Sequence, residues 1–148
     1  MRKSLWNAES RRELAERLGR LKPDATPRWG KMNAPQMLAH LVDWMSMAKG
    51  DLTTVPFRWP VRYPPLKQIL IYWFPIPKGV PTAPELLRRK ASDWAVEQAA
   101  LRKCLDAYEK PGEITNWPEH PAFGKLTTGQ WGVFGYRHMD HHLRQFGV

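Results

Sequence analysis

The sequence predicts an all-α protein, a four-helix bundle that forms a single domain over residues 1–148. Three observations support this fold class. Apolar residues recur with the 3.6-residue period of a helix, β-branched residues are too few to indicate a sheet, and Pro and Gly divide the chain into four helical stretches. A chain of 148 residues has the length of one domain and can bury one hydrophobic core.

The first two helices are delimited by residues that typically begin and end helices. The first is predicted over residues 8–21, after Asn7, whose side chain can accept a hydrogen bond from the first turn. Pro23 lies just beyond its end, where a helix cannot continue. The second helix is predicted over residues 33–48, again with Asn at its start, and Gly50 follows it as a typical C-terminal residue.

Residues 51–84 form a proline-rich excursion between the second and third helices. Eight of the fourteen prolines lie there, which excludes a long regular element. A short helix over residues 66–73 fits the local apolar spacing. Six aromatic side chains indicate an ordered segment that packs over one end or side of the bundle, and plain packing is favoured over an aromatic wall beside a pocket. These aromatics are Phe57, Trp59, Tyr63, Tyr72, Trp73 and Phe74.

The last two helices are predicted over residues 84–110 and about 127–146. Pro111-Gly112 ends the third helix, and residues 111–126 form a loop before the fourth. The residues of the third helix that are expected to face the core are Leu87, Trp94, Ala95, Leu101 and Leu105.

Composition excludes several classes of protein. Cys104 is the single cysteine, so no disulfide and no zinc site of several thiolates can form within the chain, and we expect a buried, inert thiol. The most apolar run, residues 66–76, is about half as long as a bilayer span, so we expect a soluble cytoplasmic protein with no membrane partner. The net charge of +9 favours anionic ligands, but no recognition motif accompanies it, and nucleic acid is not an expected partner.

Three of the five histidines lie near the end of the last predicted helix. His138 and His142 are four residues apart, so they point the same way from one face of that helix. His141 is three residues from His138, and spacing alone leaves His141 and His142 as alternatives. His40 lies on the apolar face of the second helix and is expected to point inward. His120, which precedes Pro121 in the loop, is expected in a turn or at the surface.

Three inward-facing imidazoles predict a metal site. A buried imidazole without a partner costs about 1–3 kcal/mol, and one divalent cation would satisfy all three rings. Neutral imidazole nitrogens suit zinc, nickel, copper or iron, with zinc and nickel preferred here. Three protein ligands leave a coordination position open, as is usual for catalytic sites. The candidate ligands are therefore His40, His138 and His142, with His141 as the alternative to His142.

Several neighbours are candidates for supporting roles. Asp43 and Gln36 lie one turn from His40 and could contact its second ring nitrogen, and Asp43 is also a candidate general base. On the last helix, Gln145 and Asp140 could contact the second nitrogen of a ligand ring. Gly135 could open space beside the ion. Surface or packing roles remain alternatives for each of these residues.

Three segments give the chain a family resemblance. Residues 34–41, APQMLAHL, resemble the second-helix histidine segment of the DinB-like superfamily, which is grouped with the YfiT-like metal-dependent hydrolases. Residues 138–145, HMDHHLRQ, resemble the superfamily's closing H-x-x-H-H-x-x-Q motif, although Leu143 and Arg144 depart from the common HHRGQ form. Residues 120–127 and the C-terminal residues 145–147 are similar to one branch of this superfamily, which is defined only as a domain of unknown function.

The resemblance implies a function as well as a fold. It implies a four-helix DinB-like bundle whose metal ligands correspond to His40, His138 and His142, in an intracellular homodimer. It also implies an enzyme that acts on a small-molecule substrate, either by transfer of a low-molecular-weight thiol such as bacillithiol or mycothiol, or by hydrolysis of an electrophile. The alternative is a non-catalytic metal-binding or stress-response module.

Overall fold

The computed structural model describes residues 1–110, 112, 114 and 116–148, and these residues form helices and loops without a β-strand. The all-α class is therefore confirmed. The count of four helices is not, because the short helix inside the proline-rich excursion is a fifth α-helix. The α-helices are α1 (Ala8–Arg20), α2 (Ala34–Lys49), α3 (Leu66–Tyr72), α4 (Trp94–Asp106) and α5 (Thr128–Gln145). The 3-10 helices are η1 (Pro60–Arg62), η2 (Pro84–Leu86) and η3 (Ala107–Glu109).

The predicted helix ends agree with the structure in the first half of the chain. The Asn7 side chain accepts a hydrogen bond from the Ser10 amide at the start of α1. At the start of α2, Asn33 and Gln36 each accept a hydrogen bond from the other's backbone N–H. Gly50 ends α2 with a φ of 88°, a left-handed conformation that glycine adopts without strain. Local chemistry alone therefore sets the limits of these two helices.

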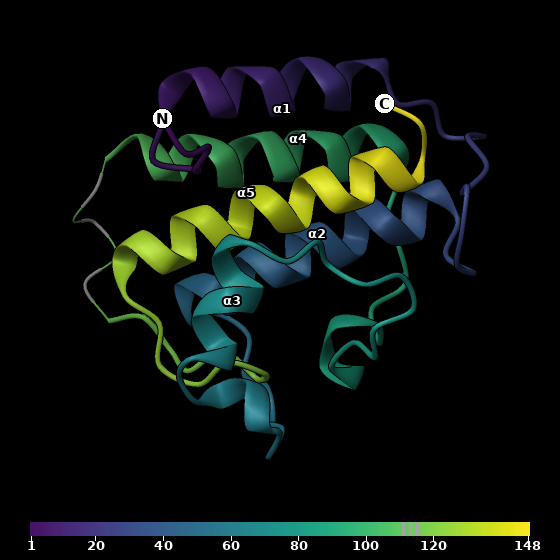
Figure 1. The fold of residues 1–148 in the computed structure, drawn as a ribbon. Coiled ribbons are helices and arrows are strands. Elements are labelled where there is room, and N and C mark those ends of the chain that lie inside the picture. Colours follow the sequence, from purple (N-terminus) through teal and green to yellow (C-terminus); the bar gives the residue numbers. More distant parts are fainter. Residues whose placement is uncertain (111, 113, 115) are drawn as a thin grey trace.

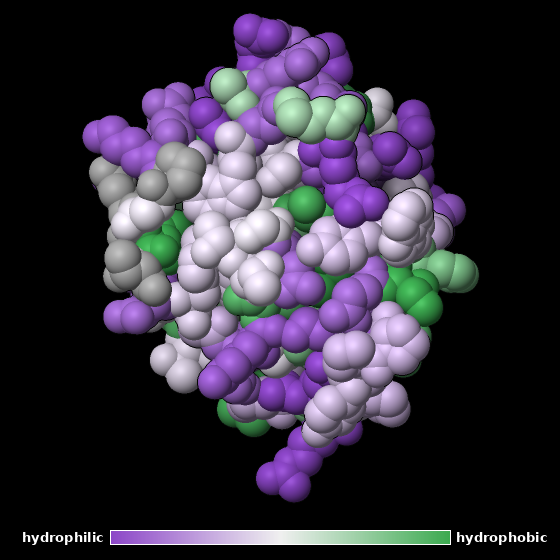
Figure 2. All heavy atoms as spheres, turned by 60° about the vertical axis from the view of Figure 1, so that its left-hand side comes forward, coloured by the Kyte–Doolittle hydropathy of each residue, from purple (hydrophilic) through white to green (hydrophobic). Residues whose placement is uncertain are grey.

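The four longer helices lie side by side, and the excursion projects from one side of them (Figure 1). Their facing sides bury the hydrophobic core, which includes Leu14, Leu18, Leu38, Leu41, Leu101, Leu105, Trp131, Met139 and Leu143. Cys104 is buried in the same core, as expected. On the face that Figure 2 shows, hydrophilic side chains are interspersed with hydrophobic ones rather than separated from them. No helix of the described part of the chain combines the length and the hydropathy required to span a bilayer.

The predicted start of the third long helix is wrong. The chain forms the 3-10 turn η2 from residue 84 and begins α4 only at Trp94. Arg89 lies in the intervening segment, and its guanidinium contacts Asp43 of α2 and Glu97 of α4. These ion pairs hold the segment across two helices, which a continuous helix from residue 84 would not allow.

Only some of the residues predicted to face the core from this helix are buried. Leu101 and Leu105 are buried, and Trp94 is partly buried. Leu87 and Ala95 are exposed because the helix has not begun at residue 87 and its buried face starts at Glu97. The expected stop at Pro111-Gly112 involves Pro111, which lies outside the described residues.

The excursion is ordered and is held against α5, as expected. Its helix α3 confirms the predicted short helix over residues 66–73. The Arg137 guanidinium of α5 donates hydrogen bonds to the backbone carbonyls of Leu70 and Phe74. Leu70 and Ile76 line the same cavity as His138 and His142, so the excursion lies beside the predicted metal ligands.

Candidate metal centre

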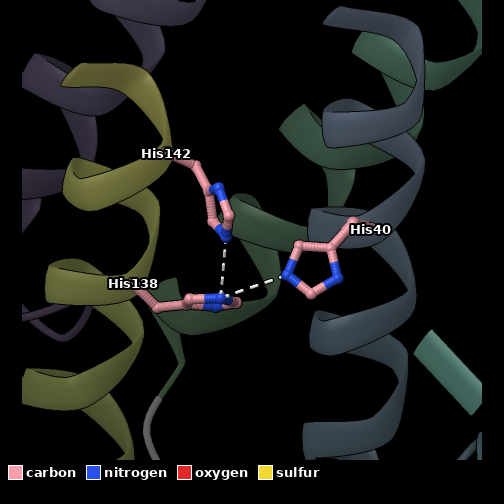
Figure 3. A group of neighbouring side chains, drawn as sticks. All are labelled: His40, His138 and His142. Carbon is pink, nitrogen blue, oxygen red and sulfur yellow. Dashed lines mark hydrogen bonds between the residues drawn. The ribbon is translucent and has the colours of Figure 1, made fainter. Parts of the chain in front are cut away.

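Two helices bring three histidine rings together in the interior (Figure 3). His138 and His142 extend from successive turns of α5, and His40 extends toward them from α2. The His138 Nε2 lies 3.2 Å from the Nε2 of His40 and 3.2 Å from the Nε2 of His142. One ring nitrogen from each histidine lies within 4.8 Å of the others, and the three residues are only 2%, 9% and 7% exposed (His40, His138 and His142). The spacing in the sequence has thus become a cluster of potential ligands.

Carbonyl oxygens determine which nitrogen carries the proton in two of the rings. The Nδ1 of His142 lies 2.8 Å from the Gln145 Oε1, whose amide is oriented by a 2.8 Å bond from its Nε2 to the Trp29 carbonyl. The Nδ1 of His40 lies 3.4 Å from the Leu86 carbonyl. Because a carbonyl oxygen only accepts, both Nδ1 atoms carry the hydrogen. Each Nε2 therefore presents a lone pair to the centre of the cluster.

The hydrogen-bonding capacity at the centre of the cluster is not satisfied, because two Nε2 lone pairs face one donor at most. The Nε2 of His138 can carry one hydrogen, which cannot point along both of its 3.2 Å contacts at once. Its Nδ1 is buried and has no hydrogen-bond partner among the described residues. A divalent cation accepts a lone pair from all three Nε2 atoms, so the donor set fits such an ion.

Burial keeps the cluster in the form that binds metals. Desolvation lowers the pKa of His40 to about 4 and the pKa of His142 to about 3. It also lowers the pKa of His138 well below its usual value, and the neighbouring histidines lower it further. All three rings are therefore neutral at pH 7, as coordination requires.

The structure distinguishes among the supporting residues that the sequence offered. Gln145 contacts the ring of His142, as expected. The Gln36 side chain instead accepts a hydrogen bond from the Asn33 backbone N–H at the start of α2. The Asp43 carboxylate lies 2.8 Å from the Arg89 guanidinium, and burial raises its pKa. Asp140 pairs with Arg17 at 2.7 Å. Neither carboxylate contacts an imidazole.

The structure places the ring of His142, rather than that of His141, in the cluster. The ring of His141 lies outside the cluster and meets the Trp29 ring edge-on at a centroid distance of 5.5 Å. Residues four apart on a helix are rotated by about 40°, whereas residues three apart are rotated by about 60° in the other direction. This difference directs His142 toward α2 and His141 past it.

The structure decides between the alternatives for two neighbouring residues. His120 lies in a tight turn rather than at the surface; it is only 6% exposed, and its Nδ1 accepts hydrogen bonds from the amides of Ala122 and Phe123. Burial lowers the pKa of His120 to about 3. Gly135 opens no space for an ion, because a Cβ there would lie 2.5 Å from the Cδ1 of Leu5. It allows the N-terminal segment to pack against α5.

A cavity of about 520 Å³ lies against the histidine cluster. His40, His138 and His142 belong to its wall, together with His141 and Gln145. The remaining wall includes the aromatic side chains Trp29, Trp44, Phe57, Trp59, His120, Phe123 and Phe134. Phe57 and Trp59 come from the excursion, so its aromatics line a pocket, and the expectation of plain packing is wrong for these two. The candidate metal centre is therefore accessible to a small molecule.

The comparisons with known proteins agree with this geometry. The family model of the DinB superfamily matches residues 7–146, a range that contains all three clustered histidines. No curated protein and no solved structure was found to match the chain. The match extends over nearly the whole sequence, and the chain belongs to the DinB superfamily.

Proposed function

We propose that the protein is a divalent-metal-dependent enzyme that acts on a small molecule, either by transferring a thiol to an electrophile or by hydrolysing it. The observation that carries this proposal is the convergence of three neutral Nε2 atoms in the wall of an accessible cavity. A purely structural metal site would have a fourth protein ligand and no access to a ligand-sized space. The cavity therefore favours catalysis over the alternative of a non-catalytic module.

Each part of the site has a distinct role in this proposal. His40, His138 and His142 would hold the ion, with zinc or nickel preferred for three imidazoles. A bound ion would supply Lewis acidity, which lowers the pKa of a coordinated water or thiol. Gln145 and the Leu86 carbonyl orient two of the rings and fix their tautomers. The apolar wall excludes bulk water from the substrate, which strengthens electrostatic interactions inside the cavity.

The structure gives no support to Asp43 as the general base. Its carboxylate is paired with Arg89, and it does not line the cavity. We therefore assign Asp43 to the ion pair that holds the segment before α4, rather than to proton transfer. The position of Arg89 between Asp43 and Glu97 supports that assignment.

A second hollow offers a place for an anionic thiol. It has a volume of about 590 Å³ and shares Lys31, Met32, His40, Leu86 and Leu87 with the wall of the first cavity. Lys31, Arg88 and Lys90 line it, and no Asp or Glu is among its described lining residues. A cationic groove of this kind attracts anionic ligands to the edge of the metal centre. This charge supports a low-molecular-weight thiol as the second substrate.

Metal analysis of the purified protein tests the proposal first. We expect about one divalent ion per chain by plasma mass spectrometry. His138→Ala should abolish binding, while His141→Ala, which alters the adjacent ring outside the cluster, should retain it. Metal-free wild-type protein with a helical circular dichroism spectrum, after incubation with zinc or nickel, would refute the site.

A second measurement separates an enzyme from a non-catalytic module. The metal-loaded protein is assayed for thiol conjugation to 1-chloro-2,4-dinitrobenzene and for hydrolysis of 4-nitrophenyl acetate. An enzyme should turn over one of these substrates, and His138→Ala should reduce the rate to background. Metal-loaded protein without turnover of any electrophile in a wider panel would favour the non-catalytic alternative.

A further inference from the structure

The cavity beside the metal centre carries almost no charge. Lys31 is the only Lys, Arg, Asp or Glu among the described residues that line it, although such residues make up 25% of the chain. A charged group placed against this wall would lose its hydration without gaining a partner. A ligand whose buried part carries a charge should therefore bind this wall weakly.

The apolar surface continues from the cavity to the outside of the molecule. Three large hydrophobic residues of the wall are also exposed to solvent: Trp59 by 39%, Val80 by 44% and Leu87 by 53%. Trp59 is further held in place by stacking on Phe57, with ring centroids 4.9 Å apart and an interplanar angle of 21°. Exposed hydrophobic side chains that adjoin a pocket are a usual mark of a ligand site. Here they form an apolar mouth around the cavity.

Four polar side chains of the wall lie together, and its other described polar residues are Lys31, Thr82, His120 and His141. The rings of His40, His138 and His142 lie together with Gln145, while the excursion contributes Val61, Leu70, Ile76 and Val80 but no charged side chain. A ligand with one polar end and an apolar body fits this division. The volume of about 520 Å³ lies within the range of small-molecule sites.

We propose that the cavity binds a neutral small molecule with an aromatic or branched hydrocarbon body, which enters past Trp59, Val80 and Leu87 and directs its polar end to the histidine cluster. This inference deepens the proposed function and rests on it where it identifies the ligand as the substrate. The second hollow, lined by Lys31, Arg88 and Lys90, then binds the anionic thiol. The neutral substrate and the anionic one therefore bind in different hollows. Ligand binding itself depends on the wall and not on the ion.

Fluorescence of the neutral probe N-phenyl-1-naphthylamine tests the proposal. The probe is titrated into the full chain with and without a chelator, so that absence of a metal ion leaves the measurement intact. We expect saturable binding of one probe per chain under both conditions. Val80→Asp, which places a carboxylate at the mouth, should weaken binding at least tenfold. Val96→Asp is the matched control, because Val96 is 56% exposed on α4 and does not line the cavity.

Displacement of the probe tests the requirement for a neutral body. Methyl 2-naphthoate and 2-naphthoate have the same ring system and differ in charge. In metal-free protein the ester should displace the probe at a concentration at least tenfold lower than the anion. Absence of probe binding, equal binding by the two Asp variants, or stronger displacement by the anion would overturn the inference. Loss of metal binding alone would refute the proposed function and leave this result unchanged.

Discussion

Acidification should strongly destabilise the metal-free protein, because four histidines are buried in neutral form. Burial lowers the pKa of His40 to about 4 and the pKa values of His120 and His142 to about 3, and it lowers that of His138 in the same direction. In the unfolded chain each ring has a pKa of about 6.5. The unfolded state therefore binds more protons below pH 6.5. Stability is complete above that pH and falls as the pH approaches the folded-state values.

The size of the loss follows from the width of this pH window. At pH 5 each unfolded ring gains about 2 kcal/mol from protonation, since the pH is about 1.5 units below its pKa and each unit is worth about 1.4 kcal/mol. If all four rings stay neutral in the fold, the sum is about 8 kcal/mol, which is comparable to the whole stability of a typical domain. The lowered pKa values of Glu13 and Glu97 act in the same direction at lower pH, below about 4.5.

Urea unfolding followed by circular dichroism at pH 7, 6 and 5, in the presence of a chelator, measures this loss. His120→Asn provides a control, because it retains an acceptor for the Ala122 and Phe123 amides but does not titrate. This variant should lose about 2 kcal/mol less than the wild type between pH 7 and pH 5. A wild-type free energy of unfolding that changes by less than about 2 kcal/mol over this interval would refute the assignment of neutral buried rings.

Three further predictions concern residues around the site. Gln145→Leu removes the acceptor of the His142 Nδ1 and should weaken metal affinity about 10–100-fold in a competition titration, whereas unchanged affinity would contradict an orienting role. Arg89→Met leaves the buried carboxylates of Asp43 and Glu97 without an ion-pair partner, although Glu97 still accepts a hydrogen bond from the Ser92 amide. It should lower the free energy of urea unfolding by about 3 kcal/mol, and a loss below about 1 kcal/mol would show that the pairs are dispensable. Gly135→Ala should destabilise by about 1 kcal/mol, since overpacking against Leu5 outweighs the helix preference of Ala, and an altered metal content would show instead that Gly135 borders the ion.

The parts of the site that were predictable from sequence are those that depend on a single helix. His138, His142 and Gln145 follow one another at intervals of four and three residues on α5, so their proximity is a property of helix geometry. The inward direction of His40 follows in the same way from the apolar face of α2. Helix ends with strong local signals, such as the cap at Asn33, were predictable for the same reason.

The features that the sequence left open or predicted wrongly depend on contacts between distant segments. α4 begins late because Arg89 contacts two helices, and nothing in the local sequence specifies those partners. His120 is buried because Trp44, Trp131 and Phe134 surround its turn, although its ring before a proline resembles an exposed position. The aromatic residues of α2 and α5 were visible in the sequence, but the sequence did not indicate which loop these residues would cover.

The sequence by itself determined the helical class and the inward faces of α2 and α5, because each of these follows from side-chain spacing along one helix. Spacing left His141 and His142 as alternatives, and the family resemblance favoured His142. The tertiary structure alone decided that the three nitrogens meet, which ring nitrogen faces the centre, and that a cavity adjoins them. Those properties arise from the approach of α2 to α5, from the Leu86 carbonyl, and from the excursion that returns to cover the cluster. Their energies come from burial and from contacts between residues far apart in the chain, so no local pattern records them.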